Sequence, residues 1–226
     1  MIFDGPSLLI MLVTLGFSLW AQAKVKGAYG KWSQVGSRSG MTGADIAQWM
    51  MNREGIHDVN LECIPGDLTD HYDPAAKTVR LSQNVYAGQS VAALGIAAHE
   101  VGHVIQHAQG YAPLHMRSFV YPVASLGTKI AFPLIFAGLI FQSFGFLITL
   151  GVLLFAASTA FTLITLPVEF NASSRALAAL EGGGVLAADE MPGARSVLSA
   201  AAWTYVAAAV ASVLWLLYYI SLANRD

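Results

Sequence analysis

The longest uncharged stretch of the chain constrains its fold more than any other feature. Over the range Ile130–Leu166 there is no charged residue. At a rise of about 1.5 Å per residue, this stretch is too long for one bilayer crossing, so it must fold back on itself. Its polar, glycine-containing break is Gln142–Gly145. We therefore predict a transmembrane hairpin over residues 118–166, with helices at 118–141 and 146–166.

Composition extends this membrane assignment to the whole chain. Only 12% of the residues are charged, whereas soluble domains have about 25%, and the mean hydropathy is +0.55. Two further apolar stretches of bilayer length lie at 6–23 and 197–222. We predict a mainly α membrane protein with about four transmembrane helices, surrounded by the lipid bilayer. A net charge of -2 excludes a nucleic-acid partner, because no basic surface is available to neutralise phosphates.

The first apolar stretch is predicted to be a retained anchor. A secretory signal begins with a basic region, but the only charge before residues 6–23 is Asp4, and no small-residue cleavage site follows. Basic residues come directly after the stretch, and by the positive-inside rule they hold this flank in the cytoplasm. They are Lys24, Lys26, Lys31 and Arg38.

Residues 24–117 are the only long polar segment and should form the cytoplasmic catalytic part. Residues 42–51 suit a short helix with Thr42 as its N-cap. Residues 59–64 and 78–81 alternate in polarity like half-buried strands. The segment therefore predicts a small α+β unit whose exposed edge strand could pair with an extended peptide.

A helix following these strands carries the pattern H-E-x-x-H. Ser90 is a good N-cap for it, and small and aliphatic residues predominate up to His107. His99 and His103 are four residues apart, so on a helix their imidazoles project from one face. In this pattern two histidines bind zinc and the glutamate, here Glu100, acts as general base on a metal-activated water. A metal also satisfies polar groups that would otherwise be costly in an apolar helix.

The loop at 67–74 offers a weaker set of polar residues. Asp70, His71 and Asp73 could form a second metal site, but a loop of this composition is more typical of a capped, solvated turn. His71 and Tyr72 remain candidates for contacting a transition state.

The third metal ligand must come from elsewhere in the chain. His107 lies two turns from His99 on the same helix, about 12 Å away, and cannot reach the same ion. His115 would require an astacin-like pattern, but Gln106 and Gln109 stand at the positions where that pattern has glycine and histidine.

Membrane topology selects Glu169 instead. Two predicted crossings separate it from His103, so it returns to the same side of the membrane, in a new helix that begins at Pro167. Glu181 and Glu190 return to that side too, but they stand in a helix end and a loop, which position ligands less well. The alternative role of Glu169 is a favourable acid at a helix N-terminus. The segment 167–196 thus supplies the third ligand, a helix and a loop.

The combination of His99–His103 with Leu166–Ala176 after a membrane hairpin resembles the YugP-like neutral zinc metallopeptidases of membranes. More distantly, it is similar to gluzincin membrane peptidases such as HtpX and the CAAX prenyl endopeptidases. The YugP-like resemblance covers nearly the whole chain. It implies one zinc per chain, bound by His99, His103 and Glu169, with Glu100 as the base.

The same resemblance directs attention to residues just beyond Glu169. The YugP-like pattern has aspartate where this chain has Asn171, and distant gluzincins commonly have aspartate at the position of Ser173. Both residues are candidates for supporting the zinc ligands from outside. Arg175 is a further candidate, although its spacing from Glu169 favours a salt bridge or a lipid contact.

The sequence therefore predicts a zinc endopeptidase of membrane or membrane-proximal proteins. We expect it in the bacterial cytoplasmic membrane, with its active site on the cytoplasmic side and protein or peptide substrates. The alternative is a membrane scaffold or adaptor with structural zinc or without activity, against which the intact Glu100 argues. A transporter is a third possibility, weakened by the absence of a visible internal repeat.

Overall fold

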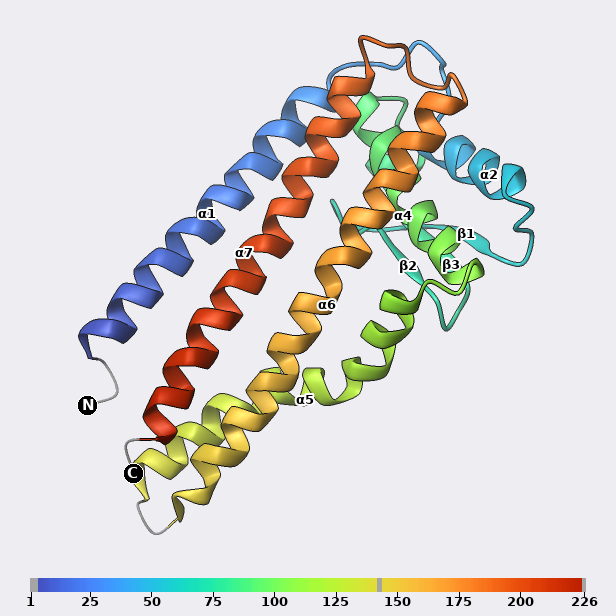
Figure 1. Ribbon diagram of the computed structural model, residues 1–226. Coiled ribbons are helices and arrows are strands. Elements are labelled where there is room, and N and C mark those ends of the chain that lie inside the picture. The colour runs from blue at the N-terminus through green and yellow to red at the C-terminus, as the bar shows by residue number, and fades with distance from the viewer. Residues whose placement is uncertain (1–3, 142–143, 225–226) are drawn as a thin grey trace. The chain divides into compact units, whose positions relative to one another are not determined.

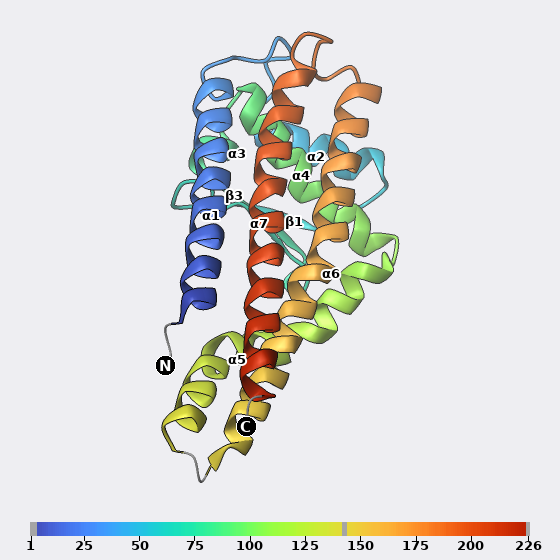
Figure 2. The same ribbon diagram turned by 60° about the vertical axis from the view of Figure 1, so that its left-hand side comes forward.

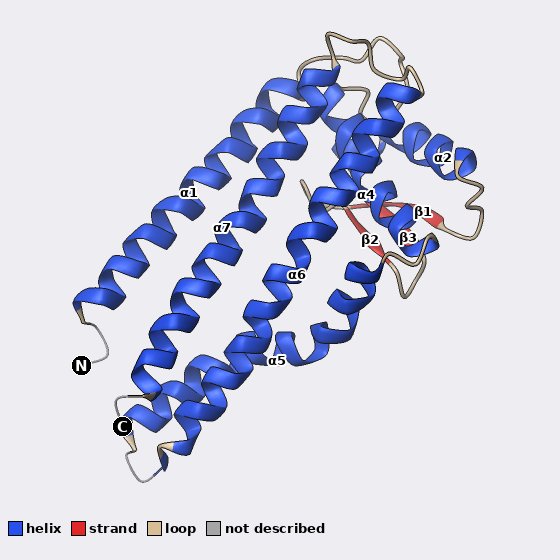
Figure 3. Ribbon diagram, in the orientation of Figure 1, coloured by secondary structure: helices blue, strands red, loops and turns tan. Residues whose placement is uncertain are grey.

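A computed structural model describes residues 4–141 and 144–224, which are mainly helical with one small sheet (Figures 1 and 3). The helices are α1 (Gly5–Trp32), α2 (Gly43–Arg53), α3 (Gln83–Tyr86), α4 (Val91–Ala108), α5 (Ala112–Ile140), α6 (Phe146–Gly182) and α7 (Met191–Ala223). The strands are β1 (Asn60–Ile64), β2 (His71–Asp73) and β3 (Thr78–Ser82).

The chain divides into two compact units. One comprises Met1–Trp20, Ala112–Pro167 and Thr204–Asp226, and the other comprises Ala21–Tyr111 and Val168–Trp203. We call them the apolar unit and the polar unit. All the predicted metal ligands belong to the polar unit.

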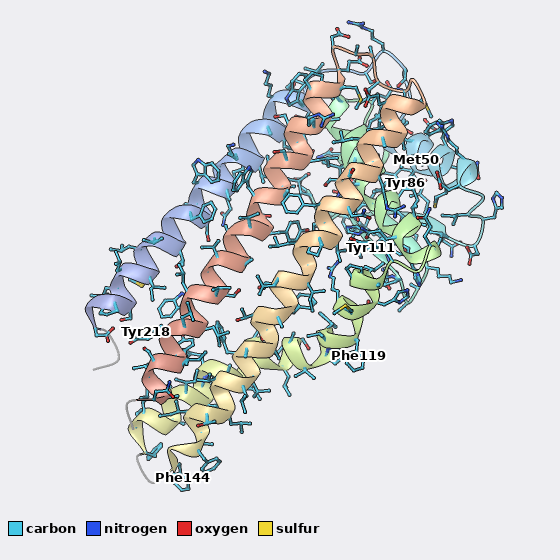
Figure 4. The ribbon with its side chains drawn as sticks, viewed as in Figure 1. Met50, Tyr86, Tyr111, Phe119, Phe144 and Tyr218 are labelled. Carbon is cyan, nitrogen blue, oxygen red and sulfur yellow. The ribbon has the colours of Figure 1, made fainter. Side chains whose placement is uncertain are left out.

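Among the described residues, four helices are long and apolar enough to cross a membrane, as the sequence predicts. They are α1, α5, α6 and α7. Within the apolar unit, α5 bends sharply in its course (Figures 1 and 2), and it contains Pro122 and Pro133, which each remove a backbone hydrogen bond. Phe119 projects outward from α5 (Figure 4) and is 86% exposed, which suits a side chain that meets lipid.

Small residues let α5 and α6 approach closely in the apolar unit. A Cβ atom added to Gly127 would lie 2.3 Å from the Leu154 carbonyl oxygen, so only glycine fits there. Ser158 of α6 donates a hydrogen bond to the Ala124 carbonyl of α5, at 2.9 Å. This pair of helices is the predicted hairpin, but Gln142 and Ser143 of its predicted turn lie outside the described residues.

Several helix boundaries differ from the sequence prediction, and α5 begins at Ala112 rather than at residue 118. The helix predicted to begin at Pro167 is instead the continuation of α6, because a membrane helix tolerates one proline when neighbouring groups satisfy the freed carbonyl. The anchor helix α1 continues to Trp32, and its lysines are good helix formers. Helix α7 begins at Met191 rather than near residue 197, with Pro192 in its first turn, where no N–H is needed.

The polar unit contains the three-stranded sheet in the order β1-β3-β2. Strands β1 and β3 are parallel, as set by the pairs Asn60–Thr78 and Ile64–Ser82, and β2 is antiparallel to β3. The predicted strands at 59–64 and 78–81 are thus confirmed. Strand β2 falls within the predicted loop 67–74, because its three residues are too few to show a periodic pattern and depend on pairing with β3.

Helices α2 and α4 pack together in the core of the polar unit. The predicted N-cap Thr42 is confirmed: its hydroxyl accepts from the Asp45 N–H, and the Asp45 carboxylate accepts from the Thr42 N–H. Met50 is 1% exposed, and Tyr86 packs against the same cluster of apolar side chains (Figure 4). This core fixes α4 as a rigid base for its polar residues.

Candidate metal centre

The candidate site forms where α4 crosses the part of α6 that belongs to the polar unit. Gly102 of α4 faces the backbone of α6, and a Cβ atom there would lie 2.5 Å from the Ala172 carbonyl oxygen. A glycine in mid-helix costs up to about 1 kcal/mol relative to alanine, and close backbone contact explains its presence. The crossing places the first residues after Pro167 beside the histidines of α4.

Three predicted ligands converge at this crossing. The Nε2 atom of His99 lies 3.2 Å from Oε2 of Glu169, and Nε2 of His103 lies 3.5 Å from the same oxygen. One ligand atom from each of the three residues lies within 4.8 Å of the others. The side chain of Glu169 is 4% exposed and those of the histidines are 14% and 11% exposed, so the group is largely shielded from water.

The donor set fits zinc. Two imidazole nitrogens and one carboxylate oxygen are the ligands of catalytic zinc sites, which leave a fourth position open. Both histidines turn Nε2 towards Glu169 and Nδ1 away from it. A bound ion therefore needs no change of ring orientation.

A buried amide holds His103. Gln106, which is 0% exposed, lies with Oε1 3.0 Å from Nδ1 of His103. Its Nε2 donates to the Val168 carbonyl at 2.7 Å and to Oδ1 of Asn171 at 3.0 Å. Gln106 thus joins a ligand of α4 to the helix that carries Glu169.

Arg175 fixes the direction of these hydrogen bonds. Its Nε donates to Oδ1 of Asn171 at 2.7 Å, and because a guanidinium has only donors, that atom must be the amide oxygen. The group that Gln106 presents to Asn171 is therefore its NH₂, and Oε1 is left to accept from Nδ1–H of His103. The proton stays on Nδ1, and Nε2 keeps the lone pair that a metal requires.

Arg175 has a second anchor outside the centre. Its Nη1 donates to Oε1 of Gln109 at 2.7 Å. Of the two contacts that its spacing favours, a salt bridge or a lipid contact, the salt bridge is not among the ion pairs of the described residues. Arg175 bonds two side-chain amides instead, that of Asn171 in α6 and that of Gln109, the residue that caps the C-terminal end of α4.

Support for His99 is simpler. The hydroxyl of Ser173 lies 3.1 Å from Nδ1 of His99. A hydroxyl both donates and accepts, so this contact alone does not select the ring tautomer. Ser173 and Asn171 were both expected near the ligands. Ser173 contacts His99 directly, whereas Asn171 reaches His103 through Gln106.

Glu100 lies beside the ligands but outside the group that could hold the ion. It is 8% exposed. Burial raises the pKa of its carboxyl group, the nearby histidines oppose this, and the charges of Glu169 and Asp70 add to it. For His103, burial disfavours the charged ring, but the hydrogen bond and charge of Glu169 outweigh it and raise its pKa.

The residues of β2 do not join the ligand group. The hydroxyl of Tyr72 and Nδ1 of His107 are hydrogen-bonded at 2.7 Å, and burial together with Asp58 and Asp73 raises the pKa of Tyr72 to about 12. His71 is exposed and donates from Nδ1 to the Thr69 carbonyl at 2.8 Å. His107 is also absent from the ligand group, as the helix geometry predicts.

The acidic residues before and within β2 are held by hydrogen bonds of the kind expected for a capped turn. Asp70 accepts from the N–H and hydroxyl of Ser82, and Asp73 accepts from two backbone N–H groups and from Arg80. Across residues 4–141 and 144–224, only the cluster on α4 and α6 brings together three or more metal-ligating side chains.

Sequence reasoning missed Gln106 and Gln109 as supporting residues. It considered them only as departures from another family's histidine pattern. The available signal was position: Gln106 is three residues after His103, hence on the same helix face, in a helix otherwise too apolar to leave an amide unpaired.

Comparisons with known proteins agree with this chemistry. The family described as "Putative neutral zinc metallopeptidase" matches residues 7–224. A curated relative, "Putative membrane protease YugP" of Bacillus subtilis (strain 168), is 46% identical over 219 residues, covering 96% of this chain and 97% of the relative. No solved structure matches the chain.

Proposed function

Because this chain belongs to the neutral zinc metallopeptidase family, we propose that it is a zinc endopeptidase integral to a membrane. Its substrates in this proposal are membrane or membrane-proximal proteins. The observation that carries the proposal is the convergence of the Nε2 atoms of His99 and His103 on the carboxylate of Glu169, beside the buried Glu100. One zinc per chain fits this ligand group.

The chemistry needs a Lewis acid and a base. Bound zinc supplies the Lewis acid, which polarises the carbonyl of the peptide bond and acidifies water. The Glu100 carboxylate accepts the proton of the attacking water and passes it to the nitrogen of the amine as the carbon–nitrogen bond breaks. Burial of Glu100 favours this role, because it raises the pKa of the carboxyl group and makes the proton easier to accept.

Gln106 and Ser173 keep the ligands oriented while Glu100 moves the proton. Each contacts the Nδ1 atom of one histidine, so neither ring can rotate without losing a hydrogen bond. Metal-bound histidines generally need such a partner for affinity and orientation.

The proposed location is the bacterial cytoplasmic membrane, with the active site on the cytoplasmic side. Support comes from the basic residues in the last turns of α1 and just beyond it, Lys24, Lys26, Lys31 and Arg38. Between His103 and Glu169 the chain has two candidate spans, which return it to the same side. Cysteine labelling from either side of intact cells, at a position such as Ser174→Cys, tests this orientation.

The decisive experiment is Glu100→Gln in the full-length protein. Zinc content, measured by mass spectrometry, should stay at one per chain, while hydrolysis of a quenched peptide should fall about 10²–10⁴-fold through loss of the base. Glu181→Gln is the matched control, because Glu181 is an exposed acid outside the ligand group, and it should leave both quantities unchanged. Undiminished cleavage by the Glu100 variant would contradict the mechanism.

A further inference from the structure

A cavity in the polar unit lies beside the end of the metal-binding helix. Its volume is about 410 Å³. Its walls come from the end of α2, the segment before β1, strand β2 and the last turns of α4. On α4 the lining residues are Val104, His107 and Ala108, and on β2 the lining residue is Tyr72. Its lining contains neither the metal-binding residues nor the base of the proposed hydrolysis.

The cavity lies on the side of α4 that carries the base. Glu100 and His107 are seven residues apart, so they fall within about 20° of each other around the helix and about 10 Å apart along it. Strand β2 packs against α4, and its Tyr72 bonds to His107. In the described sheet, β2 is an edge strand that pairs only with β3.

This spacing matches an extended peptide. Successive residues of a strand advance about 3.3 Å, so a chain cleaved beside Glu100 and running along α4 brings its third residue to the cavity. The cavity therefore lies where a substrate side chain about three residues from the cleaved bond would arrive.

The lining combines an apolar floor with an acidic rim. Ile56, Val59 and Val104 supply apolar surface suited to the stem of a long side chain. The ammonium of Lys77 is paired with Asp58 at 2.5 Å. The carboxylate of Glu54 is in no ion pair of the described residues, so the rim has one more negative than positive charge.

We propose that this cavity is a substrate subsite for a lysine or arginine side chain about three residues from the cleaved bond. The proposal rests on the proposed endopeptidase function. The aliphatic stem packs on Ile56 and Val104, and the cationic head lies beside Glu54 and Asp58. A glutamate at the same substrate position is disfavoured by these carboxylates.

Binding to the Glu100→Gln protein tests the subsite without requiring hydrolysis. Full-length zinc-loaded protein in detergent is titrated with fluorescein-labelled alanine–threonine peptides that carry arginine, alanine or glutamate at each position in turn. At one position, arginine should bind about fivefold more tightly than alanine, the upper range for a solvent-accessible ion pair. High salt should reduce the difference because the charges are accessible to ions.

Charge reversal at the rim is the critical variant. Glu54→Lys should abolish the arginine preference, and the control Glu181→Lys, an exposed acid that does not line the cavity, should preserve it. Equal affinity for the three peptides at every position, or an arginine preference that Glu54→Lys leaves intact, would overturn the subsite. Failure of the wild-type protein to hydrolyse any peptide would instead overturn the proposed function, so the two failures are distinguishable.

Discussion

The two histidines of the candidate centre are supported in different ways. His103 contacts Gln106, a fully buried amide whose remaining hydrogen bonds go to the backbone and a side chain of α6. His99 contacts one hydroxyl, that of the half-buried Ser173. Around His103 every donor and acceptor is fixed, so Nδ1 of His103 must donate to Gln106. At His99, either Nδ1 or the hydroxyl of Ser173 can be the donor.

This difference shows which part of the site depends on the crossing of the two helices. Gln106 has both amide hydrogens donated to α6, so a movement of α6 would break its contacts and release His103. A buried amide without partners costs about 1–3 kcal/mol. Water can replace a lost hydroxyl more readily at the half-buried Ser173 than it can replace the fully buried amide of Gln106. We therefore expect the loss of zinc affinity in a variant to increase with the number of contacts that it disturbs between α4 and α6.

Gly102→Ala should have the largest effect, because it disturbs both histidines together. The added methyl group meets the Ala172 carbonyl oxygen at 2.5 Å, and α4 and α6 must separate to admit it. We expect a loss of about 1–3 kcal/mol in the free energy of unfolding, with zinc binding weakened beyond that of any single supporting residue. Thermal unfolding and zinc competition with a chelator measure the two effects.

Gly27→Ala is the matched control for this substitution. Gly27 lies in α1 with no atom within 4 Å of an added Cβ, so alanine should stabilise the helix by up to about 1 kcal/mol. Gly102→Ala protein that, like the control, bound zinc normally and unfolded no lower than wild type would contradict the close contact between α4 and α6.

Gln106→Leu should have the next largest effect. Leucine fills most of the amide's volume but leaves Nδ1 of His103 and the Val168 carbonyl without this partner. Loss of an outer partner of a metal-bound histidine typically lowers metal affinity 10–100-fold. Zinc affinity by chelator competition, with hydrolysis measured at saturating zinc, separates weaker binding from a damaged reaction.

Two further variants isolate the cause. Gln106→Glu keeps an acceptor for His103 but loses the donors to α6, so its zinc affinity should lie between those of wild type and Gln106→Leu. Gln48→Leu removes an exposed glutamine of α2 and should leave zinc affinity unchanged. An unchanged affinity in Gln106→Leu would show that His103 does not need the amide.

Features of the site that depend on residues close together in the sequence could be predicted from the sequence. The caps at Thr42 and Ser90 and the four apolar helices follow from local composition and are observed. Counting crossings put Glu169 on the side of the histidines, its expected place in a helix favoured it over Glu181 and Glu190, and the structure brings it to both histidines. These inferences need only helix geometry and the length of a bilayer.

The rest depends on which side chains meet. The bonds from Gln106 to Asn171 and from Arg175 to Gln109 join residues more than sixty positions apart, and no periodic pattern records them. The resemblance indicated that Asn171 and Ser173 lie near the ligands, but it did not indicate which histidine each residue supports. The continuation of α6 through Pro167 was missed because local rules favour a new helix there, whereas a membrane helix tolerates the proline.

Ser173→Ala should have the smallest effect of the three substitutions. It removes the hydroxyl beside Nδ1 of His99 at a half-buried position, where a water can take its place more readily than at the fully buried Gln106, so we expect less than a tenfold loss of zinc affinity. Ser173→Asp should restore or exceed wild-type affinity, because a carboxylate accepts from Nδ1–H and makes the ring a stronger ligand. Ser174→Ala, at the neighbouring exposed position, is the control and should change nothing. A loss for Ser173→Ala as large as that for Gln106→Leu would mean that the two histidines are supported equally, since a replaceable hydroxyl would then matter as much as a buried amide.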